Sequence, residues 1–412
     1  MKYFFEAFSE DESTYGRLSC DFEMFEDISK FSYGTTNIDY SENLYNEFQK
    51  MRNYKETRFE IDPDGFEVRT TAEDVFNEVK IELPDSWMRG FLQVSTAMSL
   101  PAVTFHIHPM DMHAICLILR RHKEKIGPRS LRFKLRPGMP VEITFDPWNY
   151  TITCPRSQYQ GKEEREIRVW GRRRLHVLER LISVTRSFTV HLMGNGMPSF
   201  YVADMGTMSF TLGLSGWTAN DWSHMGNFDL LAPREDIDVT TKQKVFDALK
   251  TTWKSDIDSL VTMTGLTRNQ VVSALTAYTQ AGRVMYDLHK GVYRVRELTK
   301  EELPLYALRF TSDQERDANA LLVSNAVTIQ IESIPGGKML NALVKDNHEY
   351  TTTVLLDEDE GIADARCTCN FFQQNKLHKG PCPHILAAKM KYMQERKESI
   401  ISQIPHNHAT IH

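Results

Sequence analysis

The chain has 412 residues, of which 41% are apolar and 25% charged. This composition is typical of a globular protein and excludes a collagen-like, coiled-coil or wholly disordered chain, while the length predicts about two to three domains. The net charge is −6, from 49 Lys and Arg against 55 Asp and Glu, so a nucleic acid would have to bind a local basic patch.

The N-terminus lacks the apolar core of a signal peptide, because Glu6 already interrupts it. The longest apolar run, residues 114–119, is far shorter than the roughly 20 residues of a membrane helix. Three cysteines stand alone in the sequence, as buried thiols of a reducing compartment do: Cys20, Cys116 and Cys154. We therefore expect a cytoplasmic protein without a membrane partner.

Residues 1–57 are expected to form an acidic N-terminal segment, because the first 50 residues hold 11 acids and 4 bases. A helix is predicted near its end, at residues 40–54, from apolar side chains at helical spacing. Residues 58–232 are predicted to form a β-rich domain, since short alternating runs are separated by Pro-Gly and Gly-Asn-Gly turns. Two helices should interrupt it, at residues 110–125 and 174–184. No internal repeat is visible in the sequence.

Residues 238–298 have a different pattern, typical of three helices followed by a β-hairpin. The helices are predicted at residues 242–251, 256–263 and 268–281, and the strands at 284–288 and 292–295. This order resembles the winged helix-turn-helix family, whose members include both DNA-binding and protein-binding modules. Residues 240–298 contain 9 bases and 5 acids. Candidate nucleic-acid contacts are Arg268, Asn269, Gln270, Ser273 and Thr276 on the third helix, and His289, Lys290, Arg294 and Arg296 on the wing.

A second basic stretch, Arg120 to Arg136, contains 8 bases and one acid. Within it Arg132, Lys134 and Arg136 alternate with apolar residues, so they should line one face of a strand. Two interpretations stay open: a phosphate-binding surface, or a solvated face that docks the acidic N-terminal segment or an acidic partner.

The segment from His106 to His113 also allows two interpretations. His106, His108, Asp111 and His113 are all possible metal ligands. Pro109 and Asp111 equally mark an ordinary helix start, with the carboxylate near the positive end of the helix dipole. We favour the helix start.

Residues 305–400 carry the most specific signal, a pair Cys367 and Cys369, twelve intervening residues, and then Cys382 and His384. Thiolate and imidazole are the ligands that zinc prefers in a tetrahedral site, and four of them leave no open position. The spacing therefore predicts one structural Zn²⁺, which contributes on the order of 10 kcal/mol to folding. His378 is a competing fourth ligand. Strands are expected at 328–331, 342–344, 351–356 and 363–368, a helix at 385–396, and a flexible tail at 401–412.

The Cys-x-Cys and Cys-x-His pairs resemble the SWIM-type zinc finger. Residues 164–229 also resemble a class of bacterial SWIM proteins, through Arg168 to Arg174, Pro198 to Phe200 and Leu212 to Trp222. The resemblance implies DNA binding or protein interaction, and association with MoxR-type AAA ATPases and von Willebrand A-domain proteins.

The fold expected from these observations is α+β and multi-domain, with a β-rich N-terminal region, a winged helix and a C-terminal SWIM finger. No phosphate-binding loop, dinucleotide motif or metalloprotease motif occurs, so we expect no enzyme. The predicted function is zinc-dependent, non-enzymatic recognition of nucleic acid through winged helix and finger. The alternative is a protein–protein adaptor in an assembly with an AAA ATPase.

Overall fold

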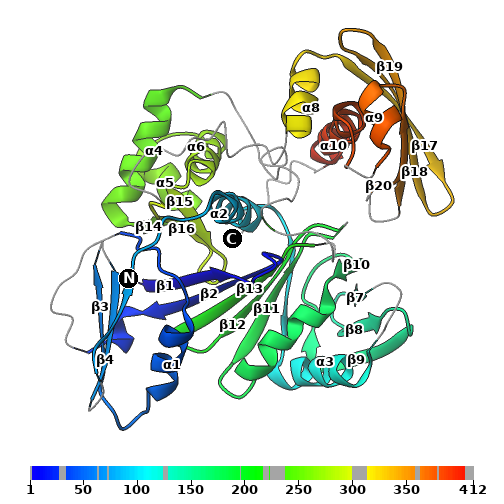
Figure 1. Ribbon diagram of the computed structural model, residues 1–412. Helices are drawn as coiled ribbons and strands as arrows, with labels where there is room; N and C mark the ends of the chain where they lie inside the picture. Colours follow the sequence, from blue (N-terminus) through cyan, green and yellow to red (C-terminus); the bar gives the residue numbers. More distant parts are fainter. Residues whose placement is uncertain are drawn as a thin grey trace. The chain divides into compact units, whose positions relative to one another are not determined.

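The computed structural model of the protein describes residues 2–26, 34–62, 65–71, 74–123, 129–194, 196–216, 222, 237–298, 313–357, 362–377 and 380–403 (Figure 1). The chain divides into two compact units. One contains residues 1–21, 97–232 and 306–412, and the other contains residues 22–96 and 233–305. This division differs from the predicted segments, because residues 1–57 and 58–232 are each shared between both units.

The first unit contains a six-stranded antiparallel sheet in the order β1-β2-β13-β12-β11-β6. Its first two strands come from the segment that we expected to stand apart as an acidic stretch. Along β2, buried residues alternate with partly exposed ones, and this alternation, typical of a strand in a sheet, matters more for the fold than the local excess of acids. The strands are β1 Lys2–Phe8, β2 Thr14–Asp21, β6 Val103–Ile107, β11 Ser187–Leu192, β12 Ser199–Asp204 and β13 Met208–Leu214.

A four-stranded antiparallel sheet in the order β10-β7-β8-β9 and two helices complete the β-rich part of this unit. Its elements are α3 Pro109–Arg121, β7 Ser130–Leu135, β8 Pro140–Phe145, β9 Tyr150–Gln158, β10 Arg165–Trp170 and the 3₁₀ helix η2 Arg172–Leu181. Both sheets and both helices contribute to one apolar core. On β7, for example, Leu131, Phe133 and Leu135 point into it and are at most 1% exposed.

The element order repeats, although no repeat is visible in the sequence. β6-α3-β7-β8-β9 and β10-η2-β11-β12-β13 are both a strand, a helix and three strands. The first strand of each half pairs with the three-stranded part of the other, β6 with β11 and β10 with β7. Each half therefore contributes one strand to the sheet of the other half.

The second predicted helix of this region is a 3₁₀ helix that begins at Arg172. Its buried residues Arg172, Leu175 and Leu178 recur every third position, which fits the three residues per turn of a 3₁₀ helix better than the 3.6 of an α-helix. The helix predicted at residues 174–184 is thus present, but as a 3₁₀ helix that begins and ends two to three residues earlier.

The second unit begins with a three-stranded antiparallel sheet, β3-β4-β5, and the helix α1. It also contains α2, which the sequence analysis did not predict. The bounds are α1 Glu42–Lys50, β3 Thr57–Asp62, β4 Gly65–Thr70, β5 Phe76–Val79 and α2 Asp85–Met98; a short 3₁₀ helix, η1, covers Phe22–Met24. Stacked rings of Phe48, Phe59 and Phe66 join α1 to the sheet.

The rest of the second unit consists of three helices and a three-stranded sheet, β14-β16-β15. They follow one another in the order expected from the sequence. Thr267 and Gln270 form a reciprocal capping box at the start of α6, and Gly265 ends α5 at φ 66°, a conformation that favours glycine. The bounds are α4 Val239–Thr252, β14 Lys254–Ser255, α5 Ile257–Thr264, α6 Arg268–Gln280, β15 Val284–Asp287 and β16 Val292–Val295.

Residues 313–403, which we call the C-terminal part, form a four-stranded antiparallel meander, β17-β18-β19-β20, covered by helices. The four strands lie where the sequence predicts them, whereas α8 and α9 were not predicted. α10 packs on the sheet and on α8. The bounds are α8 Asp313–Val323, β17 Val327–Ile334, β18 Gly337–Lys345, β19 Glu349–Asp357, β20 Ile362–Cys367, α9 Asn370–Asn375 and α10 Pro383–Gln403.

Across all described residues, we find no helix with both the length and the apolar character needed to span a membrane.

Candidate metal centre

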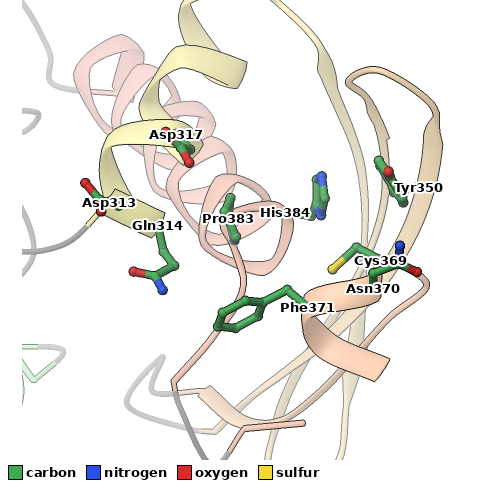
Figure 2. Close-up of a pocket in the computed structure, with 9 residues that line it drawn as sticks. All are labelled: Asp313, Gln314, Asp317, Tyr350, Cys369, Asn370, Phe371, Pro383 and His384. Carbon is green, nitrogen blue, oxygen red and sulfur yellow. The ribbon is translucent and has the colours of Figure 1, made fainter. Parts of the chain in front are cut away.

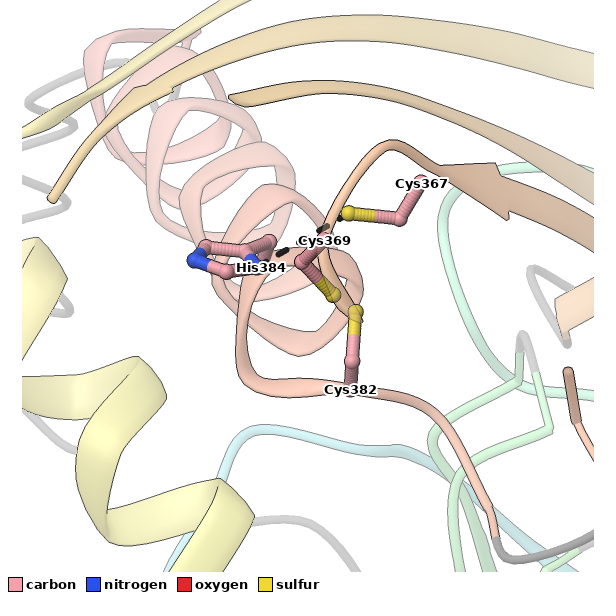
Figure 3. Close-up of side chains that lie close together, drawn as sticks. All are labelled: Cys367, Cys369, Cys382 and His384. Atoms are coloured by element: carbon pink, nitrogen blue, oxygen red, sulfur yellow. Dashed lines mark hydrogen bonds between the residues drawn. The ribbon is translucent and has the colours of Figure 1, made fainter. Parts of the chain in front are cut away.

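The C-terminal part contains a cavity of about 310 Å³ whose lining includes Cys369 and His384 (Figure 2). With Cys367 and Cys382, these side chains converge from two places in the chain (Figure 3). Cys367 ends β20 and Cys369 caps the N-terminus of α9, while Cys382 and His384 stand at the start of α10. The first pair, Cys367 and Cys369, was predicted at the end of a strand, and the second, Cys382 and His384, at the start of a helix. Both predictions are confirmed.

The geometry of the four side chains fits a tetrahedral zinc ion. Their ligating atoms all lie within 4.8 Å of one another, and Cys367 Sγ lies 3.7 Å from His384 Nδ1. Zn–S and Zn–N bonds at tetrahedral angles place those two atoms about 3.6 Å apart. All four residues are at most 7% exposed. Among the residues that the structure describes, this is the only group of three or more His, Cys, Asp or Glu able to hold a metal.

Hydrogen bonds to the sulfur atoms favour the thiolate form, which attracts a cation. Bonding from the Cys382 thiol lowers the pKa of Cys367 and raises the pKa of Cys382, which favours the thiolate form of Cys367. The backbone N–H of Phe372 donates to Cys369 Sγ at 3.4 Å. Zinc displaces the remaining thiol protons, because thiolate is the form that binds metal. Three thiolates, one imidazole and Zn²⁺ then carry one net negative charge.

The imidazole of His384 is held from the side opposite the sulfur atoms. Its ring packs on Tyr350 with centroids 4.3 Å apart, and its Nε2 lies 3.7 Å from Asp346 Oδ2. Nδ1 faces the sulfurs, so a zinc ion on Nδ1 leaves the proton on Nε2 (Figure 3). Nε2 is buried and makes no hydrogen bond among the described residues.

Two alternative ligand sets are not supported by the described residues. His378 lies outside the part of the chain that the structure describes. At the earlier candidate segment, His108 Nδ1 accepts from the Met110 N–H at 3.1 Å and caps α3. Asp111 is buried and accepts from the backbone N–H of Arg156 and the hydroxyl of Ser157. This segment is therefore an ordinary helix start, as favoured from the sequence.

The candidate contact Arg294 is not on an exposed wing. Its guanidinium is buried and donates to Asp287 Oδ2 at 2.8 Å. Ser273 and Thr276, expected on the exposed side of α6, are 6% and 5% exposed. Arg296, also predicted on the wing, is buried as well. The assignment of these four residues to a nucleic-acid surface is wrong for this conformation, because alternation and helical periodicity do not reveal what covers a polar face.

The other candidate nucleic-acid contacts on α6 and the hairpin are accessible to solvent, but some of them already interact with neighbouring side chains. Arg268 forms an ion pair with Asp258, and the side chain of Gln270 accepts from Thr267 in the capping box. Asn269 and Lys290 are exposed.

The bases of β7 lie on one strand face, as expected, but acids of neighbouring strands compensate them. Arg132 pairs with Asp146 at 3.1 Å, and Arg136 pairs with Glu142 at 2.5 Å. Lys134 lies in register between Glu142 and Glu166 on the flanking strands.

The sequence singled out the first bases of the stretch Arg120 to Arg136, but it did not predict that the end of α3 lies beside η2 and its bases. The exposed bases of this surface come from segments about fifty residues apart; we call Arg120, Arg121, Lys123, Arg173 and Arg180 the helical basic surface. An ion pair between Arg120 and Glu179 joins the two helices. The available signal was the three-residue spacing of η2, which turns Arg173 and Arg180 away from the core.

Comparisons with known proteins cover limited shares of the chain. The SWIM zinc finger family model matches residues 350–393. Sequence comparison with curated proteins finds no match. Among solved structures, the PCNA2–PCNA3 complex from Sulfolobus tokodaii is similar at a TM-score of 0.40 and 12% identity, over 53% of this chain and 86% of that chain. Proliferating Cellular Nuclear Antigen from Entamoeba histolytica is similar at 0.39 and 10%, over 52% and 84%.

Likenesses at these TM-scores carry no conclusion about this chain. The matched residues 350–393, in contrast, contain the complete set of four metal-ligating side chains. Residues 350–393 thus match a SWIM zinc finger in sequence and in donor set, and that donor set is compatible with one structural zinc ion.

Proposed function

We propose that this protein is a zinc-dependent, non-enzymatic recognition protein that binds the phosphate backbone of nucleic acid. The observation that carries the proposal is the helical basic surface. It brings five bases together beside one acid, Glu179, in a chain whose net charge is negative.

The charges of this surface are available to a ligand. Arg121, Lys123 and Arg180 form no ion pair among the described residues, in contrast to Arg132 and Arg136 of β7. A 13-residue helix such as α3 is about 20 Å long, which spans several phosphates of duplex DNA. Because Arg120 pairs with Glu179, the bases Arg121, Lys123 and Arg180 correspond to about three phosphates contacted.

Salt dependence of DNA binding tests the proposal. We expect the zinc-loaded full chain to bind a 20-base-pair duplex, with log K falling against log salt at a slope of about −3. Fluorescence anisotropy between 50 and 300 mM KCl measures it. No binding at 50 mM salt, or an affinity independent of salt, would overturn the proposal.

We further propose that residues 238–298 are a winged helix and that the finger stabilises the C-terminal part of a recognition protein. The order of three helices and a hairpin supports the first assignment. With Arg294, Ser273 and Thr276 buried, however, α6 and the hairpin present few groups to base edges. Asn269→Ala and Lys290→Gln should therefore change duplex affinity less than substitutions on the helical basic surface.

The adaptor function keeps one specific observation in its favour. The cavity beside the metal centre is lined by acids and aromatic rings, which suits a protein partner better than a phosphate.

A further inference from the structure

The cavity beside the metal centre has an excess of negative charge. Asp313 and Asp317 on α8 line it, and Arg316 pairs with both, at 2.9 and 3.7 Å, so one negative charge remains. Asp346 lies 3.7 Å from the lining residue His384. The zinc-loaded cluster adds one further negative charge, because three thiolates exceed the two charges of Zn²⁺.

The walls of the cavity suit a flat, cationic side chain. Tyr350 and Phe371 provide aromatic rings, and Gln314 and Asn370 provide amides that hydrogen-bond to a peptide (Figure 2). The faces of aromatic rings attract cations. A volume of about 310 Å³ is at the small end of ligand pockets, which suits one long side chain better than a cofactor.

An unsatisfied donor provides independent evidence for a ligand. His384 is 7% exposed and lines the cavity, and its buried Nε2 has no hydrogen-bond partner among the described residues. The nearby Asp346 Oδ2 lies at 3.7 Å, beyond hydrogen-bond distance. Nε2 points away from the sulfur atoms (Figure 3). With zinc on Nδ1, Nε2 carries a proton and needs an acceptor, such as a peptide carbonyl oxygen.

We propose that this cavity binds an arginine side chain presented by a partner protein. The guanidinium forms hydrogen bonds with Asp313 and Asp317 and stacks on the aromatic wall, while the carbonyl of the same peptide accepts from His384 Nε2. Arginine fits better than lysine because its planar fork pairs with carboxylates and stacks on rings. The site would make this protein bind a basic protein segment as well as nucleic acid.

Binding of blocked peptides to the zinc-loaded full chain tests this inference. Acetyl-Gly-Ala-Arg-Ala-Gly-amide is compared by isothermal titration calorimetry with the same peptide carrying citrulline, which keeps the shape of arginine without its charge. We expect at least tenfold tighter binding of the arginine peptide. Equal affinities would overturn the proposal.

Variants of the cavity sharpen the test. Asp313→Asn combined with Asp317→Asn should weaken binding of the arginine peptide about tenfold, and Arg316→Gln should strengthen it about threefold by removing a competing cation. Asp364→Asn, on β20 and outside the cavity lining, is the matched control and should change nothing. A zinc content of one per chain confirms that each variant is folded. If the double variant binds like the parent protein, the cavity is not the binding site.

This inference and the proposed function fail separately. The cavity variants leave the helical basic surface intact, so their duplex affinity and its salt dependence should equal those of the parent protein. Loss of duplex binding together with peptide binding in the double variant would place both ligands at one site and contradict the inference.

Discussion

Arg294 Nε donates to Asp287 Oδ2 across 2.8 Å, and the two side chains are 8% and 0% exposed. They stand on the two strands of one hairpin, where Asp287 is paired with Val292. An arginine that the sequence places on a nucleic-acid-binding wing is thus part of the internal structure of the hairpin.

Asp287→Asn should lower the free energy of unfolding by about 3 kcal/mol, because it leaves a buried guanidinium without its counter-charge. Urea unfolding of the variant and the parent protein measures the difference. The exposed pair Arg268 and Asp258 supplies the control, since Asp258→Asn should have almost no effect. Equal losses in the two variants would contradict the argument.

Cys382→Ser should abolish zinc binding and unfold residues 350–393. Serine is a poor zinc ligand, and the site contributes folding free energy only when metal is bound. Elemental analysis should show a fall from one zinc per chain to almost none, and hydrogen exchange should show lost protection in β20 and α9. Cys116→Ala, in the core of the β-rich part, should keep its zinc. Full zinc content in Cys382→Ser would rule out the assigned ligand set.

Asp346→Asn should reduce zinc affinity about tenfold. The carboxylate lies 3.7 Å from His384 Nε2, too far for a direct hydrogen bond, but its negative charge stabilises the proton on Nε2 and so increases the basicity of the ligating Nδ1. Competition with a chromophoric chelator measures the affinity. Glu349→Gln, three residues further along the same hairpin, is exposed and should bind zinc like the parent protein. Identical affinities in both variants would show that Asp346 does not act on the metal site.

Arg121→Gln combined with Arg180→Gln should reduce the salt slope of duplex binding by about 2, since each removes one phosphate contact. The affinity at low salt should fall with it. Arg136→Gln is the matched control on β7, where Glu142 already compensates the charge. A double variant with an unchanged slope would mean that DNA contacts another surface.

Acidification should destabilise the protein through His191. Burial, with a smaller contribution from His106, lowers the pKa of His191 to about 4, against about 6.5 in the unfolded chain. Below pH 6.5 His191 becomes protonated in the unfolded chain but stays neutral in the folded protein. The free energy of unfolding therefore falls as the pH drops from 6.5 towards 4. The loss between pH 7 and pH 5 is about 2 kcal/mol.

His191→Gln removes this titration, so its free energy of unfolding should fall less than that of the parent protein over the same range. Urea unfolding of both proteins at pH 7 and pH 5 checks this, and effects of zinc release cancel in the difference. Parallel pH profiles would show that His191 is not responsible.

Prediction from sequence succeeded best where the chemistry is local. The zinc site depends on four side chains in two short pairs, each placed by a strand end or a helix start. The meander β17–β20 followed from alternation of apolar residues. In contrast, β1 and β2 were hidden because the first 50 residues as a whole are acidic, although each strand holds one acid and one base. The helix α8 was hidden by weak helical periodicity.

The amino-acid sequence alone determined the donor set for zinc, because coordination chemistry requires only suitable residue types at a short, fixed spacing. Which charges are available to a ligand was decided only by the tertiary structure. Arg294 pairs with Asp287 in the interior, and Arg136 pairs with Glu142 on the next strand. Arg121 and Arg180 stay exposed on α3 and η2, two helices that pack against each other. Charge compensation depends on distances in space, and residues far apart in the chain set those distances.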